Sequence, residues 1–210
     1  MVTPQFLNVS GENGLPLQSI RPTGDDVSDN VVIQLLDASG YTIDGASYMW
    51  INWAGDSYDQ EAWVDDSDYT IKEGVTFAPG QGLWVYGSKA GQGLQTAGKV
   101  SGEDVSVQLK FGATATGNPF PVSVALQDIV PTGVDVSDNV VIQLLDASGY
   151  TVDGASYMWI NWAGDSYDQE AWVDDSDYTI KEGVTFAPGQ GLWVYGSSDS
   201  QYIRFPAPEL

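Results

Sequence analysis

Residues 46–53 read Ala-Ser-Tyr-Met-Trp-Ile-Asn-Trp, and residues 155–162 repeat them without a change. The identity extends on both sides of this stretch. When Pro22–Ser88 is aligned with Pro131–Ser197, at an offset of 109 residues, 65 of the 67 positions are identical. A period of that length is the size of an independent domain and far exceeds a solenoid repeat. We therefore predict two tandem domains from an internal duplication, with residues 1–99 as the first and residues 100–210 as the second.

The repeated stretch carries the signature of β-strands. Apolar and polar residues alternate along Val31–Leu36 and Val105–Phe111, and aromatic and β-branched residues fill Ala46–Trp53. Turn residues such as the Asp44-Gly45 pair separate these runs. Short strands between frequent turns are typical of all-β domains. The sequence predicts two antiparallel β-sandwich or open-barrel domains, with at most one helical turn, near Val124–Ile129.

The strand phase divides the residues of each strand between two faces. Along Ser47–Trp53, Met49 and Ile51 share one face, and Tyr48 and Trp50 share the other. We assign the aliphatic face to the core, so the aromatic face is expected to point outward. Outward rings either stack on the apolar face of a sugar or form cross-strand packing pairs. The candidate ligand-binding residues are Tyr48, Trp50, Trp63, Trp84, Tyr86, Tyr157, Trp159, Trp172, Trp193 and Tyr195.

The charge of the chain excludes several classes of function. The sequence holds 29 Asp and Glu against 7 Lys and Arg, for a net charge of −22, and it has no Cys and no His. Disulfides, thiolate metal sites and His-containing triads are therefore excluded. The negative field disfavours nucleic acid and anionic membranes, and no apolar run is long enough to cross a bilayer.

Composition also indicates where such a protein works. With 42% hydrophobic residues, the chain can bury a core, unlike a disordered acidic tail. An acidic folded protein suits an extracellular or saline setting, in which cations screen the repulsion. For an exported protein we expect a cleaved signal segment that these residues do not include.

One loop concentrates acids that suit a hard cation. Six acids and no base fall between positions 56 and 68. Calcium binds dense carboxylates, although the spacing lacks the EF-hand pattern and a solvated acidic loop has the same composition. We expect no required cofactor, with Ca²⁺ as the cation that these loops would bind. The candidate metal ligands are Asp56, Asp59, Glu61, Asp65, Asp66, Asp68, Asp165, Asp168, Glu170, Asp174, Asp175 and Asp177.

The distribution of carboxylates argues against catalysis. Glycosidases need paired carboxylates, one of them with a raised pKa. Here the acids cluster in loops rather than standing singly in apolar pockets, which is the environment that raises a pKa. We expect no enzymatic activity and name no catalytic residue.

Several turn motifs resemble a known kind of module. They are Gly117-Asn118-Pro119-Phe120-Pro121, Pro79–Val85 with its copy Pro188–Val194, Leu94–Val100 and Val105–Phe111. Together they resemble a tandem β-rich module of bacterial secreted and cell-surface proteins, which has a GNPFP turn and a PGQGxWV strand entry. In the first copy, Val9–Gly14 stands where the GNPFP turn would be. The resemblance implies a non-enzymatic module outside the bacterial cell or on its surface.

These observations together predict a structural or adhesive tandem-repeat module. Two alternatives stay open. One is a carbohydrate-binding module that uses the outward aromatic residues and the acidic loops. The other is a subunit of a fibre or dimer that exchanges strands, since Gly98–Phe111 is able to complete either domain. The expected partners are a glycan, another surface protein or a second copy of the chain, with no nucleic acid and no membrane insertion.

Overall fold

The computed structural model describes residues 5–8, 14–37, 39–53, 60–78, 81–96, 102–146, 148–162 and 169–208. Apart from two 3₁₀ turns, the regular structure among these residues is β-strand, so the predicted all-β class is confirmed. We call residues 5–96 the first repeat and residues 102–208 the second repeat. The predicted boundary, between residues 99 and 100, lies outside the described residues.

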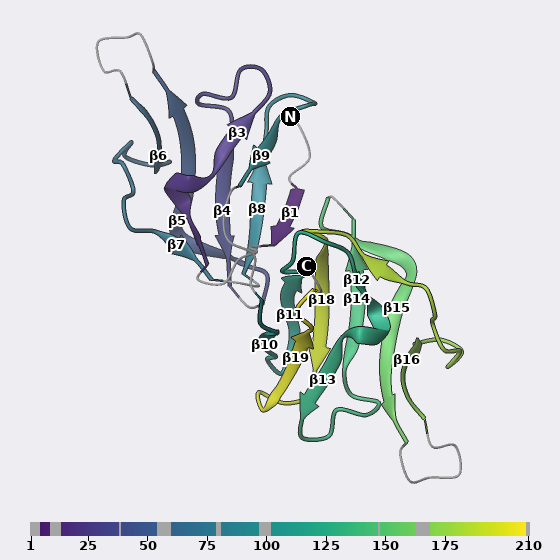
Figure 1. Ribbon diagram of the computed structural model, residues 1–210. Helices are drawn as coiled ribbons and strands as arrows, with labels where there is room; N and C mark the ends of the chain where they lie inside the picture. The colour runs from purple at the N-terminus through teal and green to yellow at the C-terminus, as the bar shows by residue number, and fades with distance from the viewer. Residues whose placement is uncertain are drawn as a thin grey trace.

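From β1 in the first repeat and β11 in the second, the strands follow one another in the same order, and the second repeat has β10 in addition (Figure 1). The first repeat contains β1 (Gln5–Asn8), β2 (Leu15–Pro16), η1 (Leu17–Ser19), β3 (Arg21–Thr23), β4 (Val32–Leu36), β5 (Thr42–Asn52), β6 (Glu61–Asp65), β7 (Thr76–Phe77), β8 (Gly82–Tyr86) and β9 (Gly93–Gln95). The second contains β10 (Val105–Gln108), β11 (Gly112–Gly117), β12 (Val124–Ala125), η2 (Leu126–Asp128), β13 (Val130–Gly133), β14 (Val141–Leu145), β15 (Thr151–Asn161), β16 (Glu170–Asp174), β17 (Thr185–Phe186), β18 (Gly191–Gly196) and β19 (Gln201–Phe205). The 3₁₀ turn η2 lies where one helical turn was expected.

Each repeat has one large sheet and a second layer of short strands. The large sheets have the orders β1-β8-β4-β5-β6 and β11-β18-β14-β15-β16. The pairs β2-β7 and β3-β9 form the second layer of the first repeat, and β12-β17 and β10-β19-β13 form that of the second. All pairings between these strands are antiparallel and stay within one repeat, and no sheet of the described residues closes into a barrel. The architecture is therefore an open, sandwich-type one.

A separate apolar core lies between the two layers of each repeat. In the first repeat, Leu17, Ile20 and Phe77 from the small layer pack in one cluster with Ile33 and Trp50 from the large sheet. The second repeat has a corresponding cluster of its own, which also includes Leu109, just after β10. Because the second layer consists of short strands and a 3₁₀ turn, the space beneath the large sheet is filled by large side chains.

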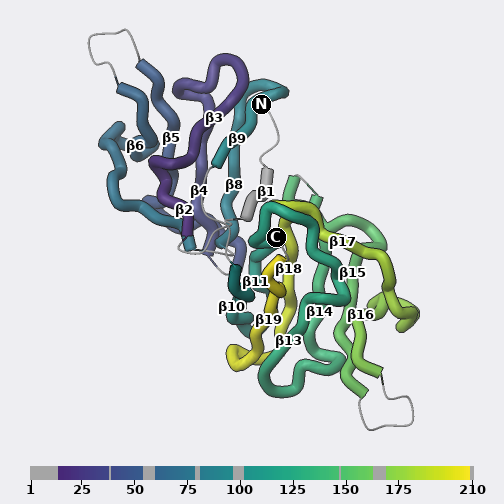
Figure 2. Tube along the Cα trace, in the orientation of Figure 1, coloured from purple at the N-terminus to yellow at the C-terminus, as the bar shows by residue number. Residues whose placement is uncertain are grey.

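The large sheets of the two repeats lie edge to edge. Strands β1 and β11 are the outermost strands of their sheets, and they contact each other. Figure 2 shows the first repeat, in purple to blue, and the second, in green to yellow, meeting at the centre of the molecule. Strand β11 also contacts β8 of the first repeat. This arrangement brings the turns after β4 and β14 close to the opposite repeat.

The turn after β4 is built by one aspartate. Asp37 Oδ1 accepts hydrogen bonds from the backbone N–H groups of Ser39, at 2.8 Å, and Tyr41, at 3.0 Å. The turn requires Gly40 at φ +78°, a left-handed conformation that glycine adopts without steric cost. Asp146 builds the same turn after β14, with Gly149 also at φ +78°.

Candidate functional site

Most of the aromatic face that was predicted to point outward lies inside the protein. Trp63 is 0% exposed, Trp50 1% and Tyr48 7%. The second repeat buries Tyr157, Trp159 and Trp172 in the same way. The expectation that these six side chains line an outward face is wrong, because buried rings offer no face to a sugar. The remaining four candidates are half-buried: Trp84, Tyr86, Trp193 and Tyr195.

The pairing register explains why the aromatic face is the inner one. Residues directly opposite each other on neighbouring strands project to the same face of a sheet. Tyr48 lies opposite Ile33, a core residue with 0% exposure, and Trp50 lies opposite Trp63. These residues therefore enter the core together. The aliphatic residues of β5, such as Met49, line the opposite face in a smaller cluster.

Trp63 is held in the core by its own polar groups. Its indole Nε1 donates a 3.0 Å hydrogen bond to the carbonyl oxygen of Ile20. The Gln18 side chain forms two hydrogen bonds with the backbone of Trp63: it accepts one from Trp63 N at 3.1 Å and donates one to Trp63 O at 2.8 Å. Trp172 and Gln127 repeat this arrangement in the second repeat. These tryptophans connect the two layers of each repeat, which is a structural role.

Trp84 and Trp193 lie between the repeats and make reciprocal contacts. A Cβ atom built on Gly149 would lie 1.9 Å from Cη2 of Trp84, and one built on Gly40 would lie 1.9 Å from Cη2 of Trp193. Both pairs are related by the offset of 109 residues, so each repeat presents the same surface to the other. Such an interface is isologous, as in a two-fold symmetric dimer.

A small apolar cluster completes this interface. Leu36 of the first repeat, and Ala115 and Leu145 of the second, are 2%, 5% and 3% exposed, and both tryptophans pack against them. Each indole covers the turn of the other repeat at a glycine, where no side chain holds the ring away. We call this set of residues the tryptophan–glycine interface.

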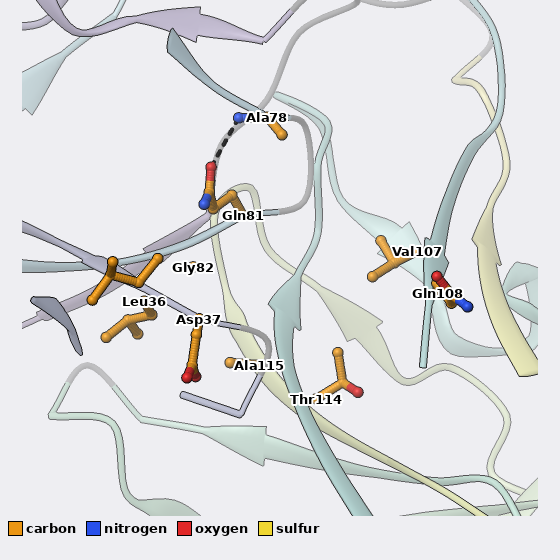
Figure 3. Close-up of a pocket in the computed structure, with 10 residues that line it drawn as sticks. Leu36, Asp37, Ala78, Gln81, Gly82, Val107, Gln108, Thr114 and Ala115 are labelled. Carbon is orange, nitrogen blue, oxygen red and sulfur yellow. Dashed lines mark hydrogen bonds between the residues drawn. The ribbon is translucent and has the colours of Figure 1, made fainter. Parts of the chain in front are cut away.

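A cavity of about 250 Å³ opens beside the tryptophan–glycine interface. Figure 3 shows residues of the first repeat on one side of it and residues of the second on the other. It is smaller than most small-molecule sites, which occupy roughly 300–1,000 Å³. Its lining residues are Leu36, Asp37, Ile43, Ala78, Gln81, Gly82, Val107, Gln108, Thr114 and Ala115.

The predicted metal-binding acids divide into two groups. Asp56, Asp59, Asp165 and Asp168 lie outside the described residues. In the first repeat, Glu61 accepts a hydrogen bond from Asn52 Nδ2, Asp66 from Ser47 Oγ and Asp68 from Thr70 N. Glu170, Asp175 and Asp177 make the corresponding contacts in the second. Within the described residues, no three acids gather in a group that could hold a metal ion.

Asp65 and Asp174 organise the turn that follows β6 and its copy. The hydroxyl and backbone N–H of Ser67 donate to Asp65 Oδ1, and Lys72 Nζ lies 3.0 Å from Oδ2. These hydrogen bonds, those from Ser67 first and that from Lys72 next, lower the pKa of Asp65 from 3.8 to about 2. Ser176 and Lys181 lower the pKa of Asp174 for the same reasons. The carboxylates therefore act as turn-forming groups.

One aromatic pair, which is present in each repeat and has an exposed tyrosine, was not predicted from the sequence. Trp53 and Tyr69 stack with their ring centroids 6.3 Å apart at 23°, and Tyr69 is 51% exposed. Trp53 Nε1 points to Asp29 Oδ2 at 3.4 Å. Trp162 and Tyr178 repeat the pair. The available signal was the position of Trp53 at the end of a strand, but nothing in the sequence brings Tyr69 beside it.

Two general findings complete the description. No helix of the described residues is long and apolar enough to span a membrane. Comparison with protein-family models, with curated proteins and with solved structures returned no match to this chain.

Proposed function

We propose that this chain is a non-enzymatic structural module of an extracellular or bacterial cell-surface protein, in which two near-identical repeats form one rigid spacer. The tryptophan–glycine interface carries this proposal. Tandem domains generally move relative to each other unless the interface between them is large and apolar. The apolar cluster here is small, and we expect it to restrict that motion because an indole from each repeat rests on a glycine of the other.

The charge of the two halves makes the proposed rigidity testable. Residues 1–96 hold 13 acids and 3 bases, for a net −10, and residues 97–210 hold 16 acids and 4 bases, for a net −12. Like charges repel over a Debye length of about 30 Å at 10 mM salt and only about 3 Å at 1 M. Two loosely connected repeats would therefore move apart as salt is removed, whereas a rigid pair would keep its dimensions.

Small-angle scattering across this salt range measures the difference. We expect the wild-type chain to keep one radius of gyration at all salt concentrations. The double variant Trp84→Ala, Trp193→Ala removes both interface rings and should expand at low salt. The matched control is Tyr69→Ala, Tyr178→Ala, which removes one exposed ring from each repeat away from the interface. Expansion of the wild type, or identical behaviour of both double variants, would contradict the rigid spacer.

Two aromatic pairs, each of an exposed tyrosine and a half-buried tryptophan, support a second candidate, carbohydrate binding. Trp53 with Tyr69, and Trp162 with Tyr178, each combine two stacked rings with a neighbouring aspartate. Flat rings beside carboxylates suit the apolar face and the hydroxyls of a sugar. A rigid spacer would hold two such pairs at a fixed separation, and bivalent attachment strengthens weak binding.

A glycan array tests this candidate. Binding that is lost in Tyr69→Ala, Tyr178→Ala would support it. The matched control is Tyr41→Ala, Tyr150→Ala, because these tyrosines are also exposed, at 74% and 73%. No glycan bound above background, or equal loss in both variants, would remove carbohydrate binding from consideration.

A further inference from the structure

Within the described residues, one edge of the first repeat has no counterpart of a strand that is present in the second repeat. In the second repeat, β19 lies between β13 and β10, whereas its counterpart β9 pairs only with β3 (Figure 1, described residues only). Gln92 confirms the correspondence, because its Nε2 donates to the carbonyls of residues 25 and 26 just as Gln201 Nε2 donates to those of residues 134 and 135. Among the described residues, no strand pairs with the second edge of β9.

Strand β10 shows what such an edge accepts. Val105 lies opposite Phe205 and Val107 opposite Ile203, while Ser106 and Gln108 between them are exposed. Leu109 continues the pattern, with its N–H donating to Gln201 O at 2.9 Å and its side chain 0% exposed. The edge therefore takes an extended segment with aliphatic residues at alternate positions, ending in a buried leucine.

The corresponding surface of the first repeat is more open. Pro22, Val85 and Gly87 are half-buried, although the identical residues at their counterpart positions are buried. Since these residues do not differ between the repeats, the difference follows from what covers them, which in the second repeat includes β10 and the larger side chains of β19. The half-buried residues of the first repeat and their buried counterparts are Pro22 and Pro131, Val85 and Val194, Gly87 and Gly196, Gln92 and Gln201, and Leu94 and Ile203.

The position of the buried leucine can be identified in both repeats. A Cβ built on Gly196 would lie 3.1 Å from Leu109 Cβ, so Leu109 packs directly over this glycine. On Gly87, the nearest atoms to a built Cβ all belong to Gln92. Gly196 thus has Leu109 among its nearest neighbours, whereas none of the atoms nearest to Gly87 comes from a residue equivalent to Leu109.

We propose that the edge of β9 with which no described strand pairs is a strand-acceptor site, which binds an extended Val-x-Val-x-Leu segment of another protein by adding it to the β3-β9 pair. Backbone hydrogen bonds would provide much of the binding, and pockets for alternate side chains would provide the specificity. The occupant is inferred from the second repeat, in which Val105–Leu109 occupies the equivalent edge. The edge strands themselves differ, since Leu94 and Thr96 stand at the positions of Ile203 and Phe205. An open strand edge is otherwise a liability for uncontrolled pairing.

A short peptide tests the proposal on the full 210-residue chain. The probe is a labelled, end-capped peptide of residues 104–110, Asp-Val-Ser-Val-Gln-Leu-Lys, titrated by fluorescence anisotropy. We expect saturable binding. Val107→Asp in the peptide should weaken it by about 10-fold to 100-fold, the value of burying one valine. Ser106→Asp, on the exposed side, should stay within about 3-fold.

Variants of the protein identify the edge that binds. Leu94→Lys places a charge at the counterpart of Ile203 and should abolish binding, whereas Gln95→Lys, on an exposed neighbour, should not. The peptide variants keep the test valid if Leu94→Lys fails to fold.

Three results would overturn the proposal. The first is equal binding of the wild-type and Val107→Asp peptides. The second is unchanged binding to the Leu94→Lys chain, which would place the peptide on the second repeat. The third is a concentration-dependent dimer that Leu94→Lys dissociates, which would assign the edge to a second copy of the chain. Scattering measures rigidity independently of the peptide, so the spacer and the acceptor site can fail separately.

Discussion

Replacing Gly40 by alanine tests the tryptophan–glycine interface most directly, because the chain provides a matched control. Gly40 and Gly45 have similar positive φ angles, 78° and 72°. An alanine at either position therefore costs roughly 1–2 kcal/mol for the left-handed backbone. At Gly45 the added Cβ would have nothing within 4 Å, whereas at Gly40 it would lie 1.9 Å from Trp193 Cη2. Only Gly40→Ala forces the Trp193 ring of the other repeat to move.

The structure sets the size of the extra effect. The Trp193 ring would have to move by about 1.5 Å to reach an ordinary carbon–carbon distance of roughly 3.5 Å. Overpacking of a well-packed contact generally costs about 1–3 kcal/mol. We therefore expect Gly40→Ala to lower the free energy of unfolding by roughly 2–5 kcal/mol and Gly45→Ala by roughly 1–2 kcal/mol.

Urea unfolding followed by tryptophan fluorescence measures both values, and small-angle scattering shows whether the repeats separate. Adding Trp193→Ala to Gly40→Ala should recover the extra cost, since the clash disappears; such coupling is what a double-mutant cycle reports. If Gly40→Ala and Gly45→Ala cost the same and leave the scattering unchanged, the indole does not rest on Gly40 in solution and the reasoning fails.

Two further predictions concern polar groups inside each repeat. The pKa of Asp65 is lowered to about 2, so its ionised form stabilises the fold above pH 4, and this contribution is lost as the pH falls toward 2. Asp65→Asn should lower Tm at pH 7 and flatten the melting curve between pH 4 and pH 2, and a Tm profile unchanged from wild type would contradict this. Trp172→Phe removes the 2.7 Å hydrogen bond to the Ile129 carbonyl, whereas Nε1 of Trp159 has no partner among the described residues. In urea unfolding, Trp172→Phe should therefore cost about 1–3 kcal/mol more than Trp159→Phe, and equal costs would refute the assigned role.

Local patterns in the sequence predict the strands and most of the turns. The alternating run Val31–Leu36 contains β4 (Val32–Leu36), and the aromatic run Ala46–Trp53 overlaps most of β5 (Thr42–Asn52). The Asp44-Gly45 turn is the exception, because it lies inside β5. There the register with β4 shifts, and Gly45 takes φ +72° within the strand. A turn signal and an irregularity in a strand need the same backbone conformation, so the residues alone do not separate them.

The face of each strand could not be fixed one strand at a time. The residues of β5 were divided correctly between its two faces, since Tyr48 and Trp50 lie on one face and Met49 and Ile51 on the other. Which face is inner depends on the register with β4, and that register is a long-range property. Hydrophobicity alone favoured the aliphatic side, although the short strands of the second layer leave room for rings.

The contacts between the repeats could not be predicted from the sequence either. Trp84 was assigned to the outer face of its sheet, and that face meets the other repeat at Gly149. No local pattern links these two residues. The alternating segment Val105–Phe111 was compatible with either repeat, because alternation indicates an edge strand without naming its sheet. The structure pairs Val105–Gln108 with β19, in the second repeat.

The reciprocal packing of Trp84 and Trp193 also affects how separate molecules associate. The two repeats of one chain present the same surface to each other, so either repeat of a neighbouring molecule is able to form the same interface. The contact within one chain is favoured over the contact between chains because the repeats are covalently linked. A short connection holds them at a local concentration on the order of millimolar. Above that concentration, we expect molecules to exchange repeats, so that crowding would convert single chains into domain-swapped pairs.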